Sequence, residues 1–256
     1  MSRVAKRTPL VMGNWKMNGS RAMIATVLRE LTQALSDQIE STCVLFPPMI
    51  YLPEVSTVLK GTSIQWGAQN VYPQSAGAFT GEVSALMLKD YACRYVLVGH
   101  SERRHLFHED LQFVAEKFHH VKEHDMIPVL CVGETLLERQ AGRTQSVLES
   151  QLRAVYRHGS SDFQAVVIAY EPVWAIGTGQ TATPEEAQRA HAFIREIVAE
   201  LNPEVAHVLP IVYGGSVNET NARALFTMPD VDGGLVGGAS LHARQFLEII
   251  TCISCC

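Results

Sequence analysis

The stretch Val166-Val167-Ile168-Ala169-Tyr170-Glu171-Pro172 carries the pattern that decides the fold. Five apolar or aromatic residues follow one another without polar alternation, and they stop at a charged residue and a proline. A strand that is apolar on both faces is typical of a parallel sheet covered by helices on each side. The stretch therefore predicts a buried parallel strand whose carboxyl end leads directly into a polar loop.

The same pattern recurs along the whole chain. Eight short apolar runs alternate with longer stretches in which apolar residues recur every three or four positions, as in amphipathic helices. The predicted strands are Leu10–Met12, Cys43–Phe46, Ile64–Ala68, Tyr95–Val98, Val129–Val132, Val166–Tyr170, Ile211–Tyr213 and Leu235–Val236. The clearest predicted helices are Ala22–Leu35, Asp110–His124, Ser146–Tyr156 and Pro184–Leu201.

Two short segments carry the features of helix starts. Thr183-Pro184-Glu185-Glu186 offers a capping hydroxyl, a proline at the first helical position and acids in the first turn, where the helix dipole favours them. Ser216-Val217-Asn218-Glu219 is a looser start signal of the same kind. We therefore expect a helix to begin at each of these two segments.

The length of the chain fits eight strand–helix units. A chain of 256 residues gives each unit about 32 residues, which is the size of a repeat in a (β/α)8 barrel. No linker rich in Pro, Gly or Ser divides the chain. We therefore expect an α/β protein with a single domain over residues 1–256, folded as a closed (β/α)8 barrel. A doubly wound open sheet is the alternative that periodicity alone leaves open.

Charge and composition exclude several classes of protein. The chain has 26 acidic and 21 basic residues and a net charge of -5, so it offers no broad attraction to nucleic acid or to an anionic membrane. No apolar run reaches the roughly 18 residues of a membrane helix, and the apolar residues after Thr8 are too few for a signal peptide. The scattered cysteines suggest reduced thiols. We expect a cytoplasmic protein without nucleic-acid or membrane partners.

Unusually polar segments follow five of the predicted strands. In a barrel of this kind, the active site is built from the loops at the carboxyl ends of the strands. The segments are Gly13–Asn18, Gly99–Arg104, Glu171–Gly179, Gly214–Ser216 and Gly237–Ser240. The sequence therefore predicts one active site at which these five loops meet.

Three charged or titratable residues in these loops have a structural and a catalytic interpretation. Partial desolvation at the end of its strand would make Glu171 a stronger base, or its carboxylate could cap a loop or pair with a lysine. His100 could be a satisfied core residue, or the following turn could favour a neutral imidazole that donates to a carbonyl. Lys16 could meet an anion at the barrel mouth, or extend over the surface as lysines usually do.

Five segments of the chain together resemble triosephosphate isomerase, most closely the bacterial form, and they occur in family order. They are residues 13–18, 98–104, 169–179, 213–217 and 235–241. The resemblance covers the whole chain and implies a TIM barrel. It implies an enzyme of glycolysis and gluconeogenesis that interconverts dihydroxyacetone phosphate and D-glyceraldehyde 3-phosphate through an enediolate, with neither cofactor nor metal.

The resemblance also implies a role for each site residue. Glu171 moves the proton between neighbouring carbons, His100 donates to the substrate carbonyl, and Lys16 neutralises phosphate and enediolate charge. This division between a glutamate base and a neutral histidine is the established description of the family and is carried over from it. The implied substrate-binding residues are Asn14, Lys16, Gly177, Ser216, Gly237 and Gly238, and the supporting residues are Glu102 and Cys131.

The loop after the sixth strand is predicted to be a lid. Trp174 and Ile176 look exposed, which is unusual for a passive connection, although a packed loop is the alternative. Gln180 stands at its C-terminal hinge where many relatives have lysine, a departure that bears on lid rates. The lid residues are Pro172, Val173, Trp174, Ala175, Ile176, Gly177, Thr178 and Gly179.

The loop over residues 69–81 lacks helical or strand periodicity, and loops of this length usually have a function. Its apolar side chains could fold back onto their own subunit, whereas the resemblance implies insertion into a second copy of the chain. We therefore expect a homodimer. The implied interface residues are Met17, Phe79, Thr80, Gly81, Glu82 and Arg103.

The remaining histidines and the C-terminal cysteines are expected to have no special role. The histidines, among them His119 and His120, lack metal-ligand partners at suitable spacing and are predicted to be solvated helix positions. Cys252, Cys255 and Cys256 depart from the family pattern. Because no second cysteine pair accompanies them, they are interpreted as exposed thiols that are prone to oxidative cross-linking.

Two other functions remain as alternatives. An aldolase-type barrel also binds sugar phosphates, but it needs a lysine placed for a Schiff base, whereas the sixth strand ends in Glu171. A catalytically silent barrel could serve as a scaffold. The joint presence of Lys16, His100 and Glu171 speaks against that alternative.

Overall fold

The strands pair in parallel with their neighbours in the sequence, and β1 also pairs with β8, which closes the sheet into a barrel. The computed structural model describes residues 7–35, 41–157, 162–177 and 179–253. The barrel prediction is confirmed, and the closure excludes an open doubly wound sheet. In this described part the strands are β1 (Leu10–Asn14), β2 (Thr42–Phe46), β3 (Gln65–Ala68), β4 (Tyr95–Val98), β5 (Ile127–Val132), β6 (Val167–Tyr170), β7 (Ile211–Tyr213) and β8 (Gly233–Val236).

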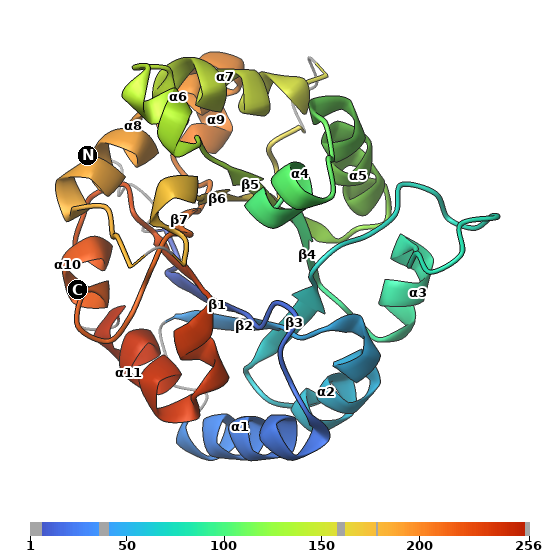
Figure 1. Cartoon of the computed structure of the whole chain (residues 1–256). Coiled ribbons are helices and arrows are strands. Elements are labelled where there is room, and N and C mark those ends of the chain that lie inside the picture. The colour runs from blue at the N-terminus through green and yellow to red at the C-terminus, as the bar shows by residue number, and fades with distance from the viewer. Residues whose placement is uncertain (1–6, 36–40, 158–161, 178, 254–256) are drawn as a thin grey trace.

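Helices form a ring around the strands (Figure 1). They are α1 (Arg21–Ala34), α2 (Leu52–Leu59), α3 (Ala85–Asp90), α4 (Ser101–Leu106), α5 (Leu111–Glu123), α6 (Leu136–Gln140), α7 (Thr144–Ala154), α8 (Pro184–Leu201), α9 (Pro203–Ala206), α10 (Ala222–Phe226) and α11 (Ala243–Ile253). Short 3₁₀ turns lie at Met49–Tyr51, Val173–Ala175 and Gly238–Leu241. Within the described residues, no helix has both the length and the apolar character that crossing a membrane would require.

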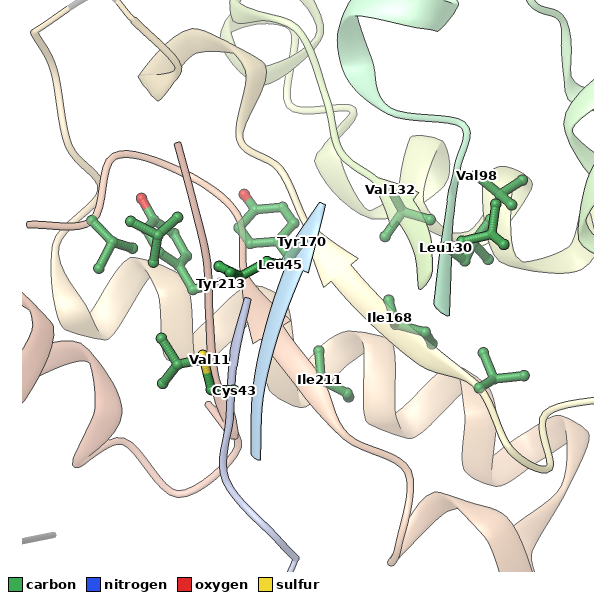
Figure 2. Packing of buried hydrophobic residues seen from close by; sticks show 14 of the residues in the cluster. Val11, Cys43, Leu45, Val98, Leu130, Val132, Ile168, Tyr170, Ile211 and Tyr213 are labelled. Carbon is green, nitrogen blue, oxygen red and sulfur yellow. The ribbon is translucent and has the colours of Figure 1, made fainter. Parts of the chain in front are cut away.

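The strands are apolar throughout because both of their faces are buried. Along β1, Leu10 and Met12 belong to the cluster inside the barrel, whereas Val11 between them belongs to the cluster under the helices. Figure 2 shows side chains of this outer cluster, contributed by several neighbouring strands. This double burial explains why the sequence lacks the alternation of apolar and polar residues that a half-exposed sheet would show.

Strand β8 begins two residues earlier than predicted, at Gly233. Glycine weakens strand propensity, so the sequence pattern did not include this part. A Cβ atom on Gly233 would lie 1.8 Å from the carbonyl oxygen of Leu10, and its φ is +138°. Glycine is therefore required where the backbone of β8 approaches β1 and closes the barrel.

One of the two predicted helix starts is confirmed and the other is wrong. Thr183 and Glu186 form a reciprocal capping box at the start of α8. No helix begins at Ser216–Glu219. The Asn218 side chain instead accepts hydrogen bonds from the backbone N–H groups of Thr220 and Asn221, which stabilises a turn, and α10 begins only at Ala222.

Three histidines predicted to be solvated are buried. His119 and His120 are each 7% exposed and His191 is fully buried, because these faces of α5 and α8 pack against the rest of the chain. His191 lies near the rings of Tyr170 and Tyr213, and its Nδ1 is 3.1 Å from the carbonyl oxygen of Asp230. Burial lowers the pKa of His191 to about 4.

The cysteines divide into a buried set and a C-terminal set. Cys43, Cys93 and Cys131 are buried thiols, as their apolar surroundings in the sequence suggested, and burial raises the pKa of Cys43 and of Cys93 to about 12. Cys252 is half-buried, and its thiol donates to the carbonyl of Ile249. The predicted thiols at positions 255 and 256 lie outside the described residues.

The burial of His191 predicts a pH-dependent stability. A histidine whose pKa is lowered on folding stabilises the native state above pH 6.5, and this contribution is lost as the pH falls towards 4. The loss amounts to about 3 kcal/mol. Denaturant titrations of wild type and His191→Asn at fixed protein concentration should show a shallower pH dependence in the variant, because asparagine can still donate to Asp230 but does not titrate.

The matched control is His207→Asn, at an exposed histidine. We expect its free energy of unfolding to vary with pH as in the wild type. A His191→Asn variant that loses stability as steeply as wild type between these pH values would contradict the assignment.

Candidate active site

A pocket of about 610 Å³ lies where the strands end. It brings together residues that follow β1, β4, β6, β7 and β8, so the prediction that these loops meet is confirmed. The pocket lining contains the residues predicted to contact the substrate: Asn14, Lys16, His100, Glu171, Gly177, Ser216, Gly237 and Gly238. An adjoining pocket of about 450 Å³ shares Asn14, Lys16 and His100 with it.

Glu171 and His100 are in direct contact at the centre of the site. Nε2 of His100 lies 3.1 Å from Oε1 of Glu171, and the backbone N–H of Ser101 donates to Oε2 of Glu171 at 2.8 Å. The residues His100 and Glu171 are only 6% and 2% exposed. The carboxylate is thus held by one backbone hydrogen bond and lies against the imidazole on the α4 side of the pocket.

The contact at Nδ1 of His100 indicates which tautomer the imidazole adopts. The backbone N–H of Glu102 points at Nδ1 of His100 at 3.2 Å, so Nδ1 serves as the acceptor. The single proton of a neutral imidazole then resides on Nε2. In this tautomer the Nε2–H donor faces Glu171 in the pocket.

Lys16 is held in an unusual backbone conformation. Its φ is +50°, a left-handed conformation that costs a residue with a side chain about 1 kcal/mol or more. Its N–H donates to Oδ1 of Asn14 at 3.0 Å, and its carbonyl accepts from Nε2 of Gln69 at 2.9 Å. Its ammonium group pairs with Glu102 at 2.5 Å. Side chains on both sides thus fix the position of this lysine.

Cys131 lies at the end of β5 beside Glu171 and is fully buried. Burial and the neighbouring carboxylate raise the pKa of this thiol well above its ordinary value. Cys131 is therefore a neutral thiol at physiological pH, and it is not a nucleophile. Cys131 was predicted to support the catalytic groups, and its burial beside Glu171 gives it a packing role there.

The loops after β7 and β8 present backbone donors to the pocket. Ser216, Gly237 and Gly238 line the pocket, and among the described residues their N–H groups donate to no other protein group. The carbonyl of Gly237 accepts from both the N–H and the hydroxyl of Ser240, which orients this turn. Such unpaired backbone N–H groups suit an anion.

The loop after β6, which is predicted to be a lid, differs from the prediction in the burial of Trp174. Trp174 looked exposed in the sequence but is only 9% exposed, because its Nε1–H donates to Glu134 at 3.0 Å and Arg139 stacks over its ring at 4.0 Å. Ile176 remains partly exposed and lines the pocket. The predicted lid residue Thr178 lies outside the described residues.

The predicted interface residues lie partly at the adjoining pocket, which is lined by Met17, Gly81, Glu82 and Arg103 but not by Phe79 or Thr80. Met17 is 97% exposed, and Phe79 is 39% exposed and stacks on Tyr72 of its own chain. The loop between β3 and α3 extends away from the barrel (Figure 1). Val71 of this loop is buried in its own subunit, and Arg103 pairs with Glu109 at 2.6 Å. The structure thus leaves Met17 and Phe79 open for contact.

Several residues of the site were missed by the sequence analysis. Ser101 belongs to the predicted loop Gly99–Arg104, so its position alone suggests that its backbone lies near Glu171. Nothing in the sequence indicated that Gln69 binds the backbone of Lys16 or that Glu134 accepts from Trp174. Their partners lie 53 and 40 positions away in the sequence, and no periodicity reveals such contacts.

Comparisons with known proteins agree with this geometry. The sequence model of the family "Triosephosphate isomerase" matches residues 9–253. A triosephosphate isomerase of Legionella pneumophila (strain Paris) is 57% identical over 248 residues, which cover 97% of this chain and 100% of the relative. That of Nitrosomonas eutropha is 51% identical over 95% of this chain and 97% of the relative. That of Haemophilus ducreyi is 50% identical over 95% and 96%. The chain therefore belongs to the triosephosphate isomerase family.

Proposed function

We propose that this protein is a triosephosphate isomerase, which interconverts dihydroxyacetone phosphate and D-glyceraldehyde 3-phosphate by proton transfer through an enediolate. The observation that carries the proposal is the 3.1 Å contact of Glu171 with His100, in a pocket that Lys16 and unpaired backbone N–H groups also line. The reaction needs a base, an acid and an anion site, and these groups supply all three. Glycolysis and gluconeogenesis in the cytoplasm are the setting that we propose for it.

Glu171 acts as the base. Its carboxylate is almost fully shielded from water at the centre of the pocket. It removes a proton from the carbon next to the substrate carbonyl and returns it to the neighbouring carbon. Its hydrogen bond from the Ser101 N–H is exchanged for contact with the substrate carbon when substrate binds.

His100 acts as the electrophile. Its Nε2–H donates to the substrate oxygen on which negative charge develops, while the backbone N–H of Glu102 holds Nδ1 as an acceptor. A neutral donor matches the weakly acidic enediol more closely than an imidazolium would. A neutral histidine in this role is the established description of the family, and we assign it to His100 on that basis.

Lys16 and the backbone amides bind the phosphate. The chain carries a net charge of -5, so a doubly charged ligand must be attracted by local groups. We propose that Asn14 and Lys16 meet the substrate on one side and that the amides of Gly177, Ser216, Gly237 and Gly238 meet the phosphate on the other. Lys16 then exchanges Glu102 for the ligand.

The lid and the dimer complete the proposal. Closure of residues 172–179 over the phosphate excludes water, so the enediolate is kept from losing phosphate. The exposed Met17 and Phe79 support a homodimer in which the loop after β3 inserts into the partner beside Gly81, Glu82 and Arg103. Closure of all eight strands into one barrel supports a single domain over residues 1–256.

Replacement of Glu171 tests the proposed base. Glu171→Gln keeps the size of the side chain and removes its basicity, so we expect kcat to fall by about 10²- to 10⁴-fold while inorganic phosphate still binds as an inhibitor. The measurement is a coupled isomerase assay, with the exposed Glu185→Gln as a control that retains wild-type activity. Undiminished turnover of Glu171→Gln would remove it as the base. Borohydride with a ketose phosphate should trap no adduct, whereas an aldolase would give one.

Replacement of Trp174 tests the lid. Trp174→Phe keeps an aromatic ring but loses the hydrogen bond to Glu134, so we expect a less well-held lid and more inorganic phosphate released per turnover. Trp66→Phe is the matched control, because it removes an indole hydrogen bond to Tyr91 far from the lid. Equal phosphate release by the two variants would argue against an anchoring role for Trp174.

Sedimentation measures the proposed dimer. We expect the wild type to have twice the mass of the chain, and Met17→Glu to shift towards the monomer because a charge would be buried in the interface. Leu137→Glu is the control, since Leu137 is 75% exposed on α6, outside the predicted interface. A fully active wild-type monomer at nanomolar concentration would contradict the dimer.

A further inference from the structure

Arg104 joins the ends of two strands beneath the catalytic pair. Its Nε–H donates to the carbonyl of Gly99 at 2.7 Å, and its Nη2–H donates to the carbonyl of Cys131 at 3.0 Å. Gly99 directly follows β4, and Cys131 lies near the end of β5. The last paired residues of these two strands are Val98 and Leu130. The guanidinium therefore continues the link between the strands where the ladder ends.

Gly99 leaves the space that this guanidinium occupies. A Cβ atom on Gly99 would lie 2.6 Å from Nη2 of Arg104 and 2.8 Å from a methyl group of Val114, and its φ is +69°. Both the conformation and the available space thus require glycine. Since His100 is the next residue, the contact with Arg104 fixes the backbone from which the imidazole projects.

The charge of Arg104 has one unneutralised partner among its acidic neighbours. Burial lowers the pKa of Arg104, while Cys131, Glu171 and Glu109 oppose that shift, and an arginine remains charged in either case. Glu109 is already paired with Arg103 at 2.6 Å and with Lys117 at 2.5 Å. Glu171 is therefore the carboxylate on which the charge of Arg104 acts.

We propose that Arg104 is a positioning residue of the isomerase reaction, which aligns the ends of β4 and β5 beside His100 through its two hydrogen bonds to backbone carbonyls. This inference rests on the proposed function. The alignment depends on the planar fork of the guanidinium, so it is tested by one variant that removes the fork and the charge and by another that removes the fork alone.

Loss of the whole guanidinium is tested with Arg104→Gln. We expect kcat to fall about tenfold or more with KM changed less than about threefold, because the misaligned imidazole affects the reaction step more than phosphate binding. A wild-type kcat, or a loss that falls on KM alone, would overturn the inference.

The fork is tested with Arg104→Lys, which retains the charge but cannot donate to both carbonyls in one plane. We expect a lower kcat at a KM close to that of the wild type. A wild-type kcat in this variant would show that the charge alone suffices and would overturn the positioning role. If Arg104→Gln fails to fold, the lysine variant still decides on the alignment.

Arg195 supplies the matched control. It is a poorly exposed arginine that also donates to backbone carbonyls, those of Ala206, Leu209 and Asp230, but it does not line the pocket. Arg195→Gln should lower the free energy of unfolding and leave kcat close to that of the wild type. An equal loss of kcat in Arg195→Gln would show that loss of stability alone lowers turnover, and it would overturn the inference. A wild type without isomerase activity would instead overturn the proposed function.

Discussion

Closure of the sheet between β1 and β8 is the constraint on which the rest of the structure depends. It requires two backbones to approach so closely that only glycine is tolerated at Gly233. Once the sheet is closed and all strands run in parallel, their carboxyl ends share one rim. Residues as distant in sequence as Asn14 and Gly238 then line one pocket. The position of the site is therefore determined by the barrel topology, and the individual side chains determine its chemistry.

The charged groups of the pocket have partners within the protein. Lys16 is paired with Glu102, and Glu171 accepts a hydrogen bond from Ser101 and lies 3.1 Å from Nε2 of His100. A substrate that brings a phosphate and a carbonyl offers each group a replacement for its present partner. Because the groups are already desolvated or paired, little solvent has to be reorganised when the substrate enters. The arrangement thus prepares the site for a doubly charged ligand in a chain that is acidic as a whole.

Much of the fold could be predicted because buried segments are recognisable from their local pattern of apolar residues. Continuous apolar runs revealed the strands, and Thr183 with Glu186 revealed the start of α8. The predictions failed where a distant partner overrides the local pattern. Trp174 is buried because Glu134 accepts its indole proton, and His191 is buried between neighbours contributed by two strands. The site residues could be located because they follow strands, whereas the contacts that orient them could not.

His100 has two tasks that draw on one ring nitrogen. Its Nδ1 caps the first turn of α4 by accepting from Glu102, and that same contact assigns the proton to the nitrogen facing Glu171. Asparagine, serine or aspartate could start the helix equally well, yet none of them offers an imidazole N–H to the pocket. Helix capping and the placement of the acid proton therefore depend on the same ring, and a substitution that preserves the cap still removes the donor from the pocket.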